Sequence, residues 1–128
     1  MDFVKNHELV VQALGQWPPF HDAKVLDVSR TGDICRASIH VFYRTDRIDA
    51  RGFFVLEKHH TVDLEFAGVS ECSLPDSYDG DILFQLLLEP LKDQFQVVFD
   101  SAIDPSHGWK LVCRSIAVTR VAPIEPSS

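Results

Sequence analysis

The chain has 128 residues, 45% of them hydrophobic, and a net charge of −7, which fit one globular domain over residues 1–128 with a flexible tail at 122–128. An acidic chain repels nucleic acid, and the longest apolar run, "ILFQLLL" at 82–88, is too short to span a bilayer. The N-terminus also lacks a signal-peptide pattern, so we expect a cytoplasmic protein that contacts neither nucleic acid nor membrane.

In the N-terminal segment, residues at three- and four-residue spacing form one stripe: Phe3, Val4, His7, Val11 and Leu14. This periodicity predicts a helix over residues 2–14 with one apolar stripe. Asp2 is the expected N-cap and Gly15 the expected end of the helix. Pro18 and Pro19 then prevent its continuation.

After this helix the pattern changes to alternation, which predicts antiparallel strands that each bury one face. In "CRASIHVFY" (35–43), one face carries Cys35 and Ile39, and the other carries Arg36 and His40. The turn "TGD" (31–33) joins "KVLDVSR" to this strand as a hairpin. Four more strands are predicted, the last apolar on both faces and therefore central: "FVLEKH" (54–59), "HTVDLEF" (60–66), "QFQVVFD" (94–100) and "KLVCRSIAVTRV" (110–121).

Residues 82–89 fit two alternatives. The neighbouring strands favour another strand, but Asp79 or Asp81 could cap a short helix that Pro90 ends. Loops are expected at 44–52, 75–81 and 103–108. Together these elements predict an α+β fold, with an N-terminal helix packed on a bent, mainly antiparallel sheet of about 6–8 strands.

The negative charge is concentrated in residues 71–104. This segment holds eight acidic residues and one basic residue, Lys92, so its net charge is −7. Such a segment attracts basic partners, although it can equally serve only solubility. The candidate partner-binding residues are its acids and the arginines of the loop "RTDRIDARG": Glu71, Asp76, Asp79, Asp81, Asp104, Arg44, Arg47 and Arg51.

The run "GQWPPFHDAKV" (15–25) holds the densest group of reactive and aromatic side chains. Adjacent residues of an extended chain point to opposite faces, so His21 and Asp22 do not form a ready-made dyad. We interpret the run as a structural corner between helix and sheet, with Trp17 and Phe20 as packing anchors and Pro18 in the turn.

No other catalytic pattern stands out. The chain has no nucleophile elbow, phosphate-binding glycine loop or metal-ligand spacing, so we expect no enzyme activity, no metal and no cofactor. A small enzyme that uses His21, Asp22 or His40 remains an alternative. The three cysteines are widely spaced, which predicts free thiols: Cys35, Cys72 and Cys113.

The run "WPPFHDAKV" resembles the Trp-Pro-x-Phe-His-Asp-Ala motif of the immunity protein 50 family, which consists of small bacterial proteins. The similarity continues through "IHVFYRTDRIDARGFFVLEKHHTVDLEFAGVSE" and "LVCRSIAVTRVAP" and so covers most of the chain. The chain departs from the expected pattern at Lys24, where an acidic residue is expected after "FHDA". The resemblance implies a cytoplasmic protein that binds and blocks a cognate toxin, and it brings no catalytic residues.

The leading hypothesis is therefore a non-catalytic protein that neutralises a toxin by direct binding, with residues 71–104 as the contact surface. Besides the small enzyme, an assembly module that uses an exposed strand edge is a further alternative. The sequence leaves both monomer and dimer open.

Overall fold

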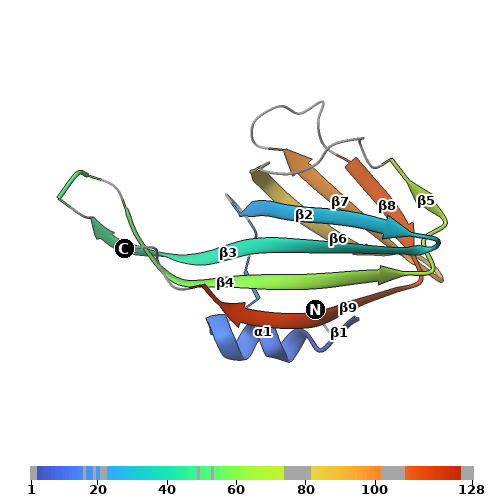
Figure 1. Ribbon diagram of the computed structural model, residues 1–128, viewed down its shortest axis with the longest axis horizontal. Helices are drawn as coiled ribbons and strands as arrows, with labels where there is room; N and C mark the ends of the chain where they lie inside the picture. Colours follow the sequence, from blue (N-terminus) through green and yellow to red (C-terminus); the bar gives the residue numbers. More distant parts are fainter. Residues whose placement is uncertain are drawn as a thin grey trace.

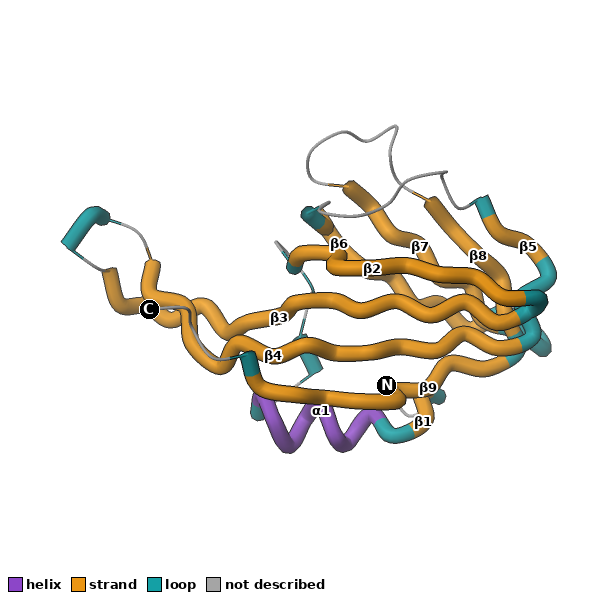
Figure 2. The backbone as a smooth tube through the Cα atoms, viewed as in Figure 1, coloured by secondary structure: helices purple, strands orange, loops and turns teal. Residues whose placement is uncertain are grey.

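The computed structural model describes residues 3–15, 17–18, 20, 23–48, 50–52, 54–73, 82–101 and 109–124, with the side chains of 43–46, 54–58 and 84 outside that description. Strands dominate the described residues, and one short helix accompanies them (Figures 1 and 2). In chain order the elements are β1 (Val4–Lys5), α1 (His7–Leu14), β2 (Lys24–Thr31), β3 (Ile34–Ile48), β4 (Phe54–Ala67), β5 (Glu71–Cys72), β6 (Leu83–Pro90), β7 (Phe95–Ser101), β8 (Trp109–Cys113) and β9 (Ser115–Pro123).

These strands form two sheets rather than the single bent sheet predicted from the sequence. Sheet A has the strand order β1-β9-β4-β3-β2, and sheet B has the order β5-β8-β7-β6. All neighbouring strands are antiparallel except β1 and β9. The two sheets face each other and enclose the core between them (Figure 1). The fold is therefore mainly β, with less helix than the α+β prediction implied.

A tight corner explains why there are two sheets. Residues 110–121 were predicted as one strand, but Arg114 divides them into β8 of sheet B and β9 of sheet A. The chain also leaves sheet A after β4 and enters sheet B at β5, turning at Gly68, whose φ is +69°. The amide of Arg114 donates to the Ala67 carbonyl at 2.9 Å, so the two crossings lie side by side.

The helix is shorter than predicted. It begins at His7, because Asn6 adopts a left-handed conformation with φ of 62° and breaks the helical path before it. Val4 instead pairs with Ile116 in a parallel bridge, so a tertiary contact overrides the helical spacing. Gly15 ends the helix as predicted, and its amide donates to the Val11 carbonyl at 2.7 Å. Asp2 lies outside the described residues.

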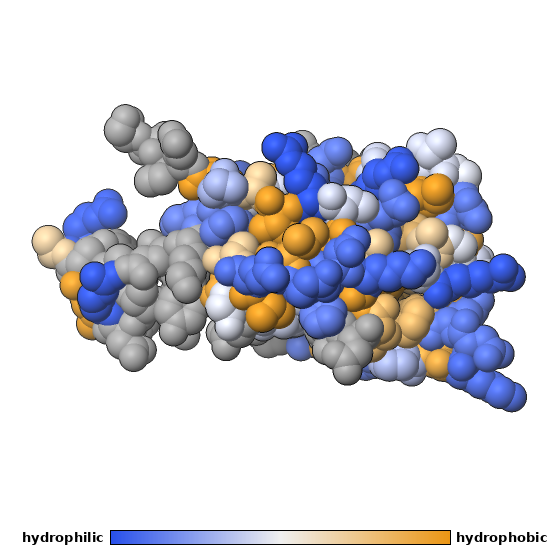
Figure 3. All heavy atoms as spheres, turned by 90° about the horizontal axis from the view of Figure 1, so that it is seen from below, coloured by the Kyte–Doolittle hydropathy of each residue, from blue (hydrophilic) through white to orange (hydrophobic). Residues whose placement is uncertain are grey.

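Helix α1 packs mainly against β9 and β4 and buries Val10 and Leu14. Leu9 remains 41% exposed next to a depression of about 330 Å³ that Val121 and Pro123 help to line. Figure 3, which views the molecule from below Figure 1, shows hydrophobic residues interspersed with hydrophilic ones on this side.

The core consists of the inward-facing residues of both sheets. Phe99 and Trp109 stack with ring centroids 4.0 Å apart, and Phe66 meets Phe99 edge-on at 6.1 Å. Residues 82–89 belong almost entirely to strand β6, which settles the choice between strand and helix. The predicted turn at "TGD" is present, with Gly32 at φ of +62° between β2 and β3.

Strands β3 and β4 extend beyond the rest of sheet A as a long ribbon (Figures 1 and 2). Strand β3 continues to Ile48, so much of the loop predicted at 44–52 is strand, and the turn lies near residues 50–52. The predicted loops at 75–81 and 103–108 lie outside the described residues. At the C-terminal end, β9 includes Ala122 and Pro123, and residues 125–128 of the predicted tail are also outside them.

Candidate partner-binding surface

The outer face of sheet B is built mainly from residues of the acidic segment. Side chains alternate along its strands, so the neighbours of buried Val97, Phe99 and Leu111 point away from the core. The strand register places these outward residues in three rows: Gln85–Asp100, then Leu87–Val98–Lys110, then Glu89–Gln96–Val112–Glu71.

The three rows differ in how many polar, apolar and charged side chains they contain. The amide of Gln85 donates to the Asp100 carboxylate at 2.6 Å. Leu87, Val98 and Val112 are half-buried even though they face away from the core. Among its described residues, the outer face therefore has an apolar centre between polar side chains, with the carboxylates of Glu71, Glu89 and Asp100 against the ammonium of Lys110.

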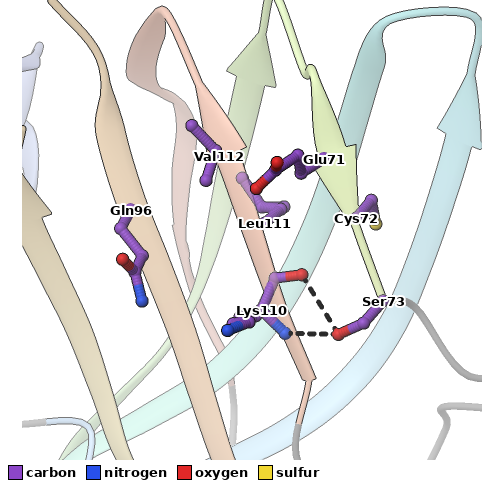
Figure 4. Close-up of a pocket in the computed structure, with 7 residues that line it drawn as sticks. All are labelled: Glu71, Cys72, Ser73, Gln96, Lys110, Leu111 and Val112. Carbon is purple, nitrogen blue, oxygen red and sulfur yellow. Dashed lines mark hydrogen bonds between the residues drawn. The ribbon is translucent and has the colours of Figure 1, made fainter.

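A shallow depression of about 230 Å³ lies at the β5–β8–β7 side of this face. Its residues come from three strands, with Glu71 and Ser73 on one side, Gln96 on the other and Lys110 and Val112 between them (Figure 4). The Lys110 amide donates to Ser73 Oγ at 3.0 Å, and the Ser73 amide donates to the Lys110 carbonyl at 2.9 Å. These bonds hold the short strand β5 in place, so the position of Glu71 is defined by the sheet.

The structure places only some of the predicted partner-binding residues. Glu71 is exposed on β5, whereas Asp76, Asp79, Asp81 and Asp104 lie outside the described residues.

The predicted acidic residues outside the description belong to two stretches, 74–81 and 102–108, and described residues flank both of them. Ser73 and Ile82 precede and follow 74–81, and Ser101 and Trp109 precede and follow 102–108. The register places all four flanking residues at the same end of sheet B. The chain therefore enters and leaves both stretches at this end.

The predicted arginine set lies elsewhere. Arg47 and Arg51 are exposed on the β3–β4 ribbon, and the side chain of Arg44 is outside the described residues. In Figure 1 this ribbon extends away from β5, so the structure does not bring Arg47 or Arg51 together with Glu71.

In the "WPPFHD" run the described residues pack against the core. Pro18 is buried, and Phe20 is 2% exposed although its φ is +59°. Trp17 is half-buried and meets Phe20 edge-on, with ring centroids 5.6 Å apart. His21 and Asp22 lie outside the described residues.

The outer face of sheet A carries a second polar surface, in which β3 and β4 contribute cross-strand pairs. Arg36 Nε donates to the Glu65 carboxylate at 3.1 Å, and Ser38 Oγ donates to the Asp63 carboxylate at 2.7 Å. Next along the strands, His40 Nε2 lies 3.0 Å from His59 Nδ1.

The ring of Phe42 lies close to both histidines, with centroids at 6.1 Å from His40 and 5.8 Å from His59. His59 cannot be predicted as the partner of His40 from the sequence, because the two are 19 residues apart and their contact depends on the register of the strands.

Burial, the neighbouring His59 and the charge of Lys24 lower the pKa of His40 below its usual value of 6.5. The unfolded chain therefore binds a proton at His40 at a higher pH than the folded chain does. As the pH falls below about 6.5, protonation of the unfolded state lowers the free energy of unfolding. We expect this loss between pH 7.5 and pH 5 to be smaller in His40→Gln than in wild type. Urea unfolding of both proteins at the two pH values measures it, and identical pH dependence would contradict the shift.

The cysteines are free thiols, as predicted. Burial raises the pKa of both Cys35 and Cys113 to about 11, which keeps these thiols protonated and unreactive. Within the described part of the chain, no three or more histidine, cysteine or acidic residues are grouped as metal ligands. The described helix is also not long and apolar enough to cross a membrane.

Comparisons of the chain with protein-family models, with curated proteins and with solved structures found no match.

Proposed function

We propose that the protein is a non-catalytic bacterial immunity protein that binds a basic toxin domain and blocks it by occlusion. The proposal combines the resemblance of "WPPFHDA" to the immunity protein 50 motif with the acidic character of residues 71–104. The surface that supports it is the outer face of sheet B, to which that segment contributes β5, β6 and β7.

Two properties of this face favour a protein partner. Its half-buried apolar centre of Leu87, Val98 and Val112 is bordered by polar side chains, which is the usual anatomy of a protein interface. Among its described side chains, carboxylates outnumber ammonium groups, so the face is complementary to a positively charged surface. The strands that carry these side chains are hydrogen-bonded to each other, so the face is formed before a partner arrives.

The substitution Val98→Lys tests this surface. We expect it to weaken binding of the cognate toxin domain at least about tenfold, because the ammonium is left desolvated in the apolar centre of the interface. Binding kinetics on the immobilised toxin domain measure the effect, and survival of toxin-expressing cells provides the biological readout.

The matched control is Gln12→Lys, which adds the same charge on the exposed side of α1. Circular dichroism and urea unfolding verify that both variants keep the fold. Association should also slow as salt rises, since the Debye length is only about 8 Å at physiological ionic strength. If Val98→Lys bound the toxin domain as tightly as the wild type, the outer face of sheet B would not be the contact surface. If the wild type did not bind the toxin domain at all, the proposed function would be wrong.

A further inference from the structure

His40 and His59 present two ring nitrogens to each other on the outer face of sheet A. His40 lies on β3 and His59 on β4, and both side chains are half-buried. His40 Nε2 and His59 Nδ1 are 3.0 Å apart, with ring centroids 5.2 Å apart and an interplanar angle of 55°. His40 pairs with Thr61, and His59 lies two residues before Thr61 on β4, beside the register shift between Val41 and Tyr43. The pairing of β3 with β4 therefore brings the two imidazoles onto the same face.

We propose that His40 and His59 form a two-imidazole site for a divalent transition-metal cation. Imidazole nitrogen is a good ligand for nickel, copper and zinc, with bonds of about 2.0–2.1 Å. With such bonds, nitrogens 3.0 Å apart subtend an angle of about 94° at the metal.

The separation of the two nitrogens can be compared with the common coordination geometries. Tetrahedral coordination would need a nitrogen separation of about 3.3 Å, whereas adjacent positions of a square or octahedral complex are about 90° apart. Both geometries require a separation within a few tenths of an ångström of the 3.0 Å contact, so the pair suits Ni²⁺, Cu²⁺ or Zn²⁺. Water molecules complete the coordination, since the two histidines supply only two ligands.

The ligand atoms determine the proton positions. For both nitrogens to bind the cation, His40 carries its proton on Nδ1 and His59 carries its proton on Nε2. Without metal, one proton between His40 Nε2 and His59 Nδ1 accounts for the 3.0 Å contact. When the cation binds, that proton moves through water to the other nitrogen of the same ring, so two neutral imidazoles keep both of their protons. Phe42 lies near both rings, with centroids 6.1 Å from His40 and 5.8 Å from His59, so the pair has an aromatic neighbour on one side.

The positive charge of one neighbouring side chain opposes cation binding. Lys24 on β2 pairs in register with His40, and its positive charge acts on the His40 ring. We therefore infer a site of modest affinity.

The test uses the full chain without an affinity tag, with Ni²⁺ alone as the probe because it does not oxidise the thiols. Isothermal titration calorimetry at pH 7.5 should show one Ni²⁺ per chain. His40→Gln and His59→Gln should each weaken Ni²⁺ binding at least about tenfold, because the second imidazole no longer binds intramolecularly. The matched controls His7→Gln, His60→Gln and Cys72→Ser should stay within about threefold of wild type.

A second measurement needs no substitution. In spectra of the wild-type histidine side chains, paramagnetic Ni²⁺ should broaden the resonances of His40 and His59 before those of His7 and His60. The proposal is overturned if the wild type binds no Ni²⁺ at about 1 mM. A site with two imidazole ligands should have a dissociation constant of about 1 mM or lower. It is also overturned if His40→Gln or His59→Gln binds like wild type, or if other histidines broaden first.

Discussion

Phe99→Ala is expected to lower the free energy of unfolding by about 3–5 kcal/mol, the range for loss of a fully buried aromatic ring. Phe99 is 0% exposed, stacks on Trp109 and meets Phe66 of the opposite sheet edge-on. The ring therefore joins sheet B to sheet A, and its removal leaves a cavity between them. Urea unfolding monitored by circular dichroism measures the loss.

The matched control is Val98→Ala, at the adjacent position of β7. Val98 is half-buried and points to the outer face, so we expect a loss of about 1 kcal/mol. Phe99→Ala shortens a side chain on the inner face of β7, whereas Val98→Ala shortens one on the outer face of the same strand. If both lost the same amount, the assignment of the inner and outer faces of sheet B would be wrong.

Much of the fold could be predicted because its signals are local. Alternating residues such as Cys35 and Arg36 predict strands, Gly32 predicts the hairpin between β2 and β3, and Gly15 predicts the end of α1. Each of these features depends on a few consecutive residues, so a single sequence is sufficient to find them.

The division into two sheets could not be predicted in the same way. The run of residues 110–121, apolar on both faces, is compatible with one long strand, and nothing in the local pattern shows that Arg114 ends one sheet and begins the other. The extended conformation of Val4 likewise depends on its partner Ile116, which is 112 residues away. Both errors occurred where a long-range contact decides the local structure.

The candidate surfaces show the same limit. Alternation predicts that Val98 and Lys110 lie on the face opposite Phe99, but their row with Leu87 follows only from the register of three strands. The pair of His40 and His59 depends on register too, because a β-bulge follows Val41. The charges of residues 71–104 identify the acidic segment from the sequence, yet only some of its acidic residues lie in the described part of sheet B.

Gly68→Ala is the most direct test of the corner that divides the sheets. A Cβ at residue 68 would lie 2.8 Å from Cβ of Arg114 and 2.9 Å from its Cγ, closer than these atoms can approach. Arg114 cannot easily move away, because its amide donates to the Ala67 carbonyl at 2.9 Å. The φ of +69° adds strain of its own, since an L-residue pays about 1–2 kcal/mol in this conformation.

We therefore expect Gly68→Ala to lower the free energy of unfolding by about 2–5 kcal/mol, the sum of the backbone strain and an overpacking cost of about 1–3 kcal/mol. Gly32→Ala is the matched control, because Gly32 has a similar φ of +62° and no atom within 4 Å of the added Cβ. It should lose only the strain of about 1–2 kcal/mol. Urea unfolding of the two variants separates the contributions. Equal losses would show that Arg114 moves away from the added methyl group. The close contact between the two crossings would then not determine how the sheets are arranged.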